Sequence, residues 1–180
     1  MKSIVVVTGS PRQNGNSNRL AAAFISEAEN LGLKVTRFDT AEMDIAPCQG
    51  CESCIDAKAC FMEDDFIEIA SALEQADGIV IVSPVYCYTF TAQIKLMLDR
   101  CFSLYCAGKL YEGKKCALIS CCEEATPSTF TGIKFSFDRT IELMKGQIVG
   151  EVLIPGVYKA GDVNNTDGIA QVKALAHKFI

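Results

Sequence analysis

The chain has 180 residues, 49% of them hydrophobic, which is enough to bury one core, and it is expected to fold as a single domain over residues 1–180. Lys and Arg number 17 against 22 Asp and Glu, a net charge of −5, and no basic run is present, so nucleic acid is excluded as a partner. No apolar stretch approaches the roughly 20 residues that span a bilayer. With no signal peptide recognised at its start, the protein is predicted to be cytoplasmic, with no membrane partner.

The first predicted strand is the β-branched run from Ile4 to Val7, and a polar segment at 8–18 follows it. This segment has glycines for a tight turn and leads into a helix predicted from about Arg19 to Leu31. Because a helix N-terminus offers unpaired N–H groups and a positive dipole end, the segment is interpreted as a loop that binds a single terminal phosphate. The alternative is a polar turn with an ordinary N-cap. Its candidate anchors are Ser10, Arg12, Asn16, Ser17 and Asn18.

A second strand is predicted around Val35 and Phe38, and a cysteine-rich loop at 46–62 follows it. Its cysteines have the spacing C-x2-C-x2-C-x5-C, and thiolates this close repel one another unless a soft cation or an iron–sulfur core shares their charge. Three alternatives stay open at this point, namely a disulfide pair, a structural zinc site and ordinary free thiols. The candidate ligands are Cys48, Cys51, Cys54 and Cys60.

A helix from about Asp65 to Leu73 and a buried strand from Gly78 to Val82 are predicted next, and an aromatic loop at 83–90 follows the strand. Its residues Pro84, Val85 and Tyr86 are the candidates for positioning a planar ring. A ligand with a phosphate at one end and an aromatic plane at the other has the shape of FMN. The alternative is that the aromatic residues belong to the core or to a subunit interface.

Helices and strands continue to alternate to the end of the chain. Such alternation predicts an α/β fold with a doubly wound parallel sheet of five strands and five helices, which binds ligands beyond the C-terminal ends of its strands. The remaining predicted elements are a helix from Thr91 to Cys106, a strand from Cys116 to Ser120, a helix within Thr131–Lys145, a strand from Ile148 to Ile154 and a helix from Asp167 to Lys178.

Assembled, these segments resemble the flavodoxin-like NAD(P)H-dependent FMN reductase superfamily, and specifically its iron-sulfur flavoprotein branch. The resemblance implies a five-stranded sheet of order 2-1-3-4-5 with helices on both faces, an FMN cofactor and a 4Fe-4S cluster held by the four cysteines. It also implies a homodimer or homotetramer in which the cluster and the flavin of neighbouring subunits approach each other. The matching residues are Gly9-Ser10-Pro11-Arg12 with Gly15-Asn16-Ser17, Ser83-Pro84-Val85-Tyr86, Lys95 with Asp99-Arg100, and the cysteine segment running into Asp64-Asp65.

The leading functional hypothesis is a redox protein that passes single electrons from a ferredoxin-like carrier through the cluster to FMN and on to a small-molecule acceptor. The acidic segment at 121–126 disfavours a phosphate-bearing nicotinamide and so favours a protein donor such as ferredoxin over NADPH. One alternative is an FMN-only NAD(P)H-dependent flavin or quinone reductase, and the other is a zinc-stabilised flavodoxin-like carrier or interaction module. No catalytic side chain is expected, because the flavin carries the chemistry and the only histidine, His177, lies in the last predicted helix.

Overall fold

The computed structural model describes all 180 residues and contains one five-stranded sheet with the strand order β2-β1-β3-β4-β5. All four pairs of neighbouring strands are parallel, which confirms the predicted flavodoxin-like fold class and strand order. The strand order reverses between β1 and β3, so the loops after these two strands flank the crevice where such sheets bind ligands. The strands are β1 (Ser3–Thr8), β2 (Lys34–Asp39), β3 (Gly78–Pro84), β4 (Lys115–Cys121) and β5 (Gln147–Ile154).

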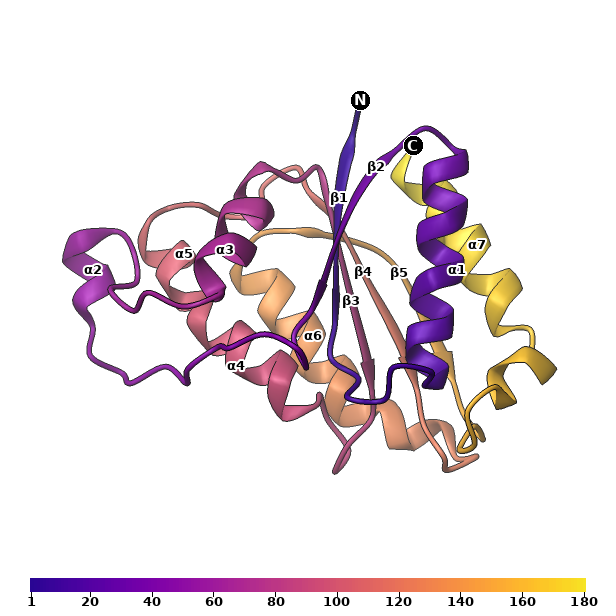
Figure 1. Ribbon diagram of the computed structural model, residues 1–180. Coiled ribbons are helices and arrows are strands. Elements are labelled where there is room, and N and C mark those ends of the chain that lie inside the picture. Colours follow the sequence, from indigo (N-terminus) through magenta and orange to yellow (C-terminus); the bar gives the residue numbers. More distant parts are fainter.

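Helices cover both faces of this sheet. In Figure 1, α1 and α7 lie together on one face, and α3, α4 and α6 lie on the other. No helix is long and apolar enough to cross a bilayer. The helices are α1 (Asn16–Asn30), α2 (Ser53–Ala57), α3 (Phe66–Gln75), α4 (Ala92–Arg100), α5 (Phe102–Cys106), α6 (Thr131–Leu143) and α7 (Gly168–Ala176), with short 3-10 turns at Pro127–Phe130, Asp162–Asn165 and His177–Phe179.

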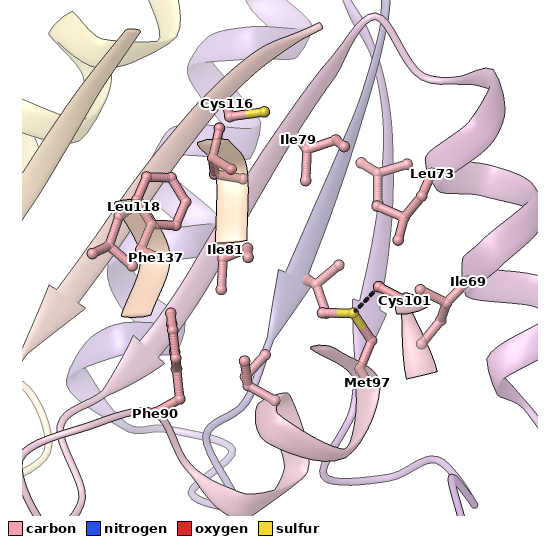
Figure 2. Close-up of a cluster of buried hydrophobic side chains, with 14 of the residues drawn as sticks. Ile69, Leu73, Ile79, Ile81, Phe90, Met97, Cys101, Cys116, Leu118 and Phe137 are labelled. Atoms are coloured by element: carbon pink, nitrogen blue, oxygen red, sulfur yellow. Dashed lines mark hydrogen bonds between the residues drawn. The ribbon is translucent and has the colours of Figure 1, made fainter. Parts of the chain in front are cut away.

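The core consists of two layers, because the side chains of a strand point alternately to opposite faces of the sheet. Ile4 and Val6 of β1 pack toward α1 and α7, whereas Val5 belongs to the cluster under α3, α4 and α6. Figure 2 shows this second cluster, in which Ile81 of β3 and Met97 of α4 are among the buried side chains. Burial on both faces explains why the central strands are continuously apolar in the sequence.

The single helix predicted from Thr91 to Cys106 is wrong, because the structure divides it into α4 and α5 at Cys101. The Ser103 hydroxyl donates to the Arg100 carbonyl oxygen at 2.9 Å. This side-chain hydrogen bond competes with the backbone hydrogen bonds that would continue α4. The short helix α2 inside the cysteine-rich loop was also not predicted. The helix count is therefore seven where the sequence predicts five.

Candidate functional site

A hollow of about 370 Å³ opens beyond the C-terminal ends of β1, β3 and β4. Its lining combines the phosphate-loop segment at 8–18, the turn after β3, the end of β4 and the loop after β5. Of the eight residues predicted to bind FMN, only Asn18 lies outside this lining. Those that the structure brings together are Ser10, Arg12, Asn16, Ser17, Pro84, Val85 and Tyr86.

At the phosphate-loop end of the hollow, helix α1 begins without a side-chain cap. The first-turn N–H groups of residues 16–18 have no intrahelical partner, as in every α-helix. The N-cap residue is Gly15, which has no side chain to accept a hydrogen bond from them. A Cβ atom at Gly15 would lie 3.0 Å from both the Arg12 carbonyl oxygen and the Ser10 Oγ. The glycine therefore keeps open a cradle of donors at the positive end of the helix dipole, which suits an anion.

The two asparagines of this segment bind protein backbone with their side chains. The Asn16 amide donates to the Lys159 carbonyl oxygen at 3.0 Å and accepts from the Gly161 N–H at 3.0 Å, so it ties the loop after β5 to α1. The Asn18 amide donates to the Arg12 carbonyl oxygen at 2.9 Å, and Asn18 does not line the hollow. Both side chains shape the loop, and only the backbone N–H groups of these residues remain free for a ligand.

Arg12 supplies the positive charge of this end of the hollow. Its guanidinium carbon lies 5.5 Å from the ring centroid of Tyr158, and its Nη1 donates to the Tyr158 carbonyl oxygen at 3.3 Å. No carboxylate pairs with Arg12, so its charge is available to a ligand. The sequence reasoning missed Tyr158; the available signal was its position just beyond β5, at the edge of the sheet where the other loops meet.

The turn after β3 has an uncommon backbone geometry. The backbone N–H groups of Tyr86 and Thr89 each donate to the other residue's carbonyl oxygen, at 3.0 and 3.1 Å. Cys87 and Tyr88 between them have φ angles of 47° and 65°. Two left-handed residues between paired ends form a type I′ turn, a conformation that glycine and asparagine adopt more readily than these residues do.

Two contacts hold this strained turn in place. The Tyr88 hydroxyl donates to Glu124 Oε1 at 3.2 Å, and this hydrogen bond to a carboxylate raises the pKa of Tyr88. Helix α6 approaches from the other side, where a Cβ atom at Gly132 would lie only 2.2 Å from the Tyr88 carbonyl oxygen. The turn therefore presents Tyr86 to the hollow from a supported position.

Two thiols form part of the wall between the phosphate end and the turn. Burial raises the pKa of Cys121 to about 12, and it also raises the pKa of Cys122. Both are therefore neutral near pH 7 and act as small apolar wall residues instead of nucleophiles. Glu123 beside them is the only acidic residue of the lining.

The four predicted cysteine ligands line a second, separate hollow of about 180 Å³. All ten cysteines are free thiols, and no group of three or more His, Cys, Asp or Glu side chains is arranged to hold a metal ion. A cubane cluster binds each thiolate through a different iron, so its ligands lie farther apart than the ligands of one ion. Four thiols around a shared hollow therefore suit a cluster better than a single ion. The cysteines that line this second hollow are Cys48, Cys51, Cys54 and Cys60.

The environments of these thiols differ. Hydrogen bonds from the Ser53 hydroxyl and N–H lower the pKa of Cys51. Burial raises the pKa of Cys54, and the neighbouring thiol of Cys106 raises it further. Cys106 comes from α5, against which α2 packs, and it lies outside the sequence motif. The sequence reasoning missed this fifth thiol because only the tertiary contact places it beside the loop.

A buried ion pair lies at the base of the cysteine loop. The Arg100 side chain is 1% exposed and that of Asp64 10%, and the guanidinium meets both carboxylate oxygens, at 2.6 and 3.1 Å. Burial alone would raise the pKa of Asp64, but hydrogen bonds from Arg100 and from the N–H groups of Ala46 and Phe66 lower it. Burial alone would lower the pKa of Arg100, but Asp64 and the Cys60 thiol raise it.

Replacing Asp64 with asparagine is expected to lower the free energy of unfolding by about 3–5 kcal/mol, because it leaves Arg100 buried without its counter-charge. The folded-state pKa of Asp64 is depressed, so its stabilisation is present above the unfolded carboxyl pKa of about 3.9 and is lost as the pH falls through the folded value. The variant should therefore lose less stability than the parent on acidification below about pH 4. Urea denaturation between pH 2.5 and 7 measures both effects.

The matched control is Asp138→Asn, which removes a half-exposed carboxylate paired with Lys134 on helix α6. A change of less than about 1 kcal/mol is expected there, because exposed ion pairs contribute little. Equal losses for the two variants would contradict a special role for the buried pair.

A family model described as NADPH-dependent FMN reductase matches residues 2–128. An iron-sulfur flavoprotein of Archaeoglobus fulgidus is 35% identical over 100 residues, which are 56% of this chain and 45% of that relative. An iron-sulfur flavoprotein of Clostridioides difficile is 29% identical over an alignment of 182 positions, which covers 98% of this chain and 77% of the relative. The match to the Archaeoglobus protein thus spans about half of that protein's length.

Among solved structures, an azoreductase from Bacillus anthracis superimposes with a TM-score of 0.80 at 17% sequence identity. The superposition covers 99% of this chain and 100% of the azoreductase chain. At this identity, the likeness shows a common fold. It agrees with the strand order of the sheet.

Proposed function

Because the chain belongs to the NADPH-dependent FMN reductase family, we propose that it is a flavin-dependent oxidoreductase that binds FMN in the hollow beyond β1, β3 and β4. The observation that carries this proposal is the uncapped start of α1, where Gly15 keeps a cradle of N–H donors open beside the supported Tyr86 turn. One end of the hollow suits a phosphate and the other a planar ring. FMN, when bound, supplies hydride and single-electron transfer.

The residues have distinct parts in holding this cofactor. The N–H groups of residues 16–18 and the free charge of Arg12 would bind the phosphate. Pro84, Val85 and Tyr86 would position the ring, against a wall that includes the neutral thiols of Cys121 and Cys122. The resulting site is positive at the phosphate end and has Pro84, Val85 and two neutral thiols at the other, where Glu123 is the single acidic residue.

For the cysteine loop we propose a 4Fe-4S cluster bound by Cys48, Cys51, Cys54 and Cys60. Two observations support it, namely the hollow that these four thiols share and the names of the relatives, which are iron-sulfur flavoproteins. A ferredoxin-like carrier would supply electrons, and a small molecule would accept them from the flavin. The predicted cytoplasmic location stays a prediction.

The two hollows have no lining residue in common. The cysteine loop also projects from the body of the fold, with α2 at the edge of the molecule farthest from α1 and α7 (Figure 1). This separation supports the proposal that the chain forms a homodimer or homotetramer, in which the cluster of one subunit serves the flavin of another.

A second candidate is an FMN-only NAD(P)H-dependent reductase of free flavins or quinones, with the cysteines unused. The description of the matching family, NADPH-dependent FMN reductase, favours this candidate. No three ligand side chains are arranged around one point, which disfavours a zinc-stabilised module, since structural zinc is held by four Cys or His ligands around one ion.

Protein purified without oxygen distinguishes these functions through its absorption spectrum and its contents of FMN, iron, acid-labile sulfide and zinc. FMN with iron and sulfide supports the proposed function. FMN with neither, together with steady-state turnover by NADH or NADPH in the absence of a carrier, supports the reductase. Protein that binds no FMN under any preparation contradicts both.

Replacing Gly132 with alanine is expected to raise the dissociation constant of FMN by about tenfold and to cost about 1–3 kcal/mol of stability, as overpacking does. The added Cβ would lie 2.2 Å from the Tyr88 carbonyl oxygen, so the turn that presents Tyr86 must move. Fluorescence titration of the apoprotein with FMN measures the affinity. Ser136→Ala on the same helix α6 is the control and should leave the affinity unchanged; a loss of stability in Gly132→Ala without any loss of affinity would exclude the turn from FMN binding.

A further inference from the structure

The cysteine loop is attached to the fold at both of its ends by one buried side chain of helix α4. Arg100 Nη1 donates to the Ala46 carbonyl oxygen at 3.0 Å, just before the first cysteine. Its Nη2 donates to the Met62 carbonyl oxygen at 3.4 Å, just after the last cysteine. A single guanidinium thus connects the two ends of the segment that carries all four candidate ligands.

Asp64 completes this attachment. Its Oδ2 accepts the Ala46 N–H at 3.0 Å, so the N–H and the carbonyl of Ala46 are both bound by the ion pair. The Phe66 ring lies under the guanidinium, with its centroid 4.8 Å from the guanidinium carbon. The planar, five-donor group of arginine is suited to such simultaneous contacts, and the compact ammonium of lysine is not.

Between these ends the loop has no core of its own. None of the residues 47–61 is buried, and none of the residues of α2 is buried. Hydrogen bonds such as that from the Lys58 N–H to the Cys54 carbonyl oxygen are local and do not join the loop to the sheet. The position of the cysteines therefore depends mainly on the two clamped ends and on the contact of α2 with α5.

One donor of Arg100 remains without an acceptor. The Nε atom is buried and has no hydrogen-bond partner, whereas both other nitrogens are bound. Arg100 lines the same hollow as Cys60. Buried donors without partners are rare and costly, and this one belongs to a side chain that shares its hollow with the candidate ligand Cys60.

We propose that Arg100 is the positioning residue of the cysteine loop, which clamps the loop at Ala46 and Met62 and donates a hydrogen bond to the Cys60 thiolate. The second part rests on the cluster proposed above, and the first part does not. A hydrogen bond to a ligand sulfur stabilises the reduced, more negative cluster and so raises its reduction potential.

The test compares Arg100→Lys with the parent in two forms of the protein. In cluster-free protein with FMN bound, hydrogen exchange of the amides at 46–62 is expected to accelerate about tenfold, because the clamp is lost while the charge is kept. In cluster-loaded protein, the equilibrium constant for one-electron reduction of the cluster is expected to fall about tenfold, which corresponds to about 59 mV, with the FMN potential unchanged. Arg139→Lys is the matched control, because Arg139 is an exposed arginine that pairs only with Glu142.

Unchanged loop exchange in Arg100→Lys overturns the clamp, and an unchanged cluster potential overturns the hydrogen bond to Cys60. If the parent purified without oxygen contains FMN but no iron, the proposed cluster fails, and the exchange measurement still decides the clamp. If Arg100→Lys does not fold, the double variant Arg100→Gln with Asp64→Asn removes both charges together. Faster exchange confined to 46–62 in that variant supports the clamp, and unchanged exchange overturns it.

Discussion

Cys54→Ala protein prepared without oxygen is expected to contain less than about a tenth of the parent's iron and acid-labile sulfide, while FMN stays bound in full. A cubane cluster takes one thiolate for each of its irons, and the remaining three thiols cannot complete that set. FMN binding should survive because the two hollows have no lining residue in common. Iron and sulfide analysis and the visible spectrum measure both cofactors.

Cys106→Ala is the matched control for this experiment. Its thiol neighbours that of Cys54 but lies on α5, outside the four-cysteine spacing, and its removal should leave the cluster in place. If Cys54→Ala retained a cluster, and the double variant Cys54→Ala with Cys106→Ala lost it, Cys106 would be a substitute ligand. If Cys54→Ala lost FMN and iron together, the loop would have a structural role and the separation of the two sites would be wrong.

Gly15→Val is expected to weaken FMN binding by at least about a hundredfold, because it fills the cradle at the start of α1. Each hydrogen bond to a charged group contributes about 1.5–3 kcal/mol, so the loss of two such bonds to the phosphate reaches that size. Gly15 has a φ of −65° and a ψ of 160°, which valine also adopts, so backbone strain does not contribute. The effect therefore reports the space that a side chain takes from the anion.

Asn14→Val is the control, since it adds the same side chain one residue earlier at an exposed position with an ordinary φ. Its FMN affinity should stay within about twofold of the parent, as expected for a surface position away from the contacts. Titration of both apoproteins with FMN gives the affinities, and thermal unfolding shows whether either variant is generally destabilised. Full affinity in Gly15→Val would rule out this cradle as the phosphate site.

The two proposed redox centres lie on different parts of the fold. The proposed FMN hollow lies where the strand order reverses, at the ends of the strands, whereas the cysteine loop lies between β2 and α3 and is held at its base and by the contact of α2 with α5. Such a loop can change in a related chain without disturbing the sheet. This chain can therefore have the same fold as an azoreductase and also be similar in sequence to iron-sulfur flavoproteins.

The sequence by itself determined the parallel sheet, because strands buried on both faces must be apolar at every position, as Ile4–Val7 and Gly78–Val82 are. It also identified half of the residues that line the hollow beyond β1, β3 and β4, since loops after neighbouring parallel strands meet at one edge of a sheet. It did not reveal the break at Cys101, where a side-chain hydrogen bond from Ser103 competes with the helix.

Only the tertiary structure decided which side chains face the ligand and which support it. Asn16 and Asn18 have the residue type of phosphate donors, yet the Asn16 side chain binds the backbone of the loop after β5 and the Asn18 side chain binds the Arg12 carbonyl oxygen of its own segment. Tyr158 and Arg100 are far along the chain from the loops that they support. No local pattern marks Tyr158, and the family pattern that includes Arg100 does not indicate its contacts with the cysteine loop. The physical reason is that local sequence sets periodicity and turn chemistry, whereas a buried donor takes whichever acceptor the packing of distant segments places within reach.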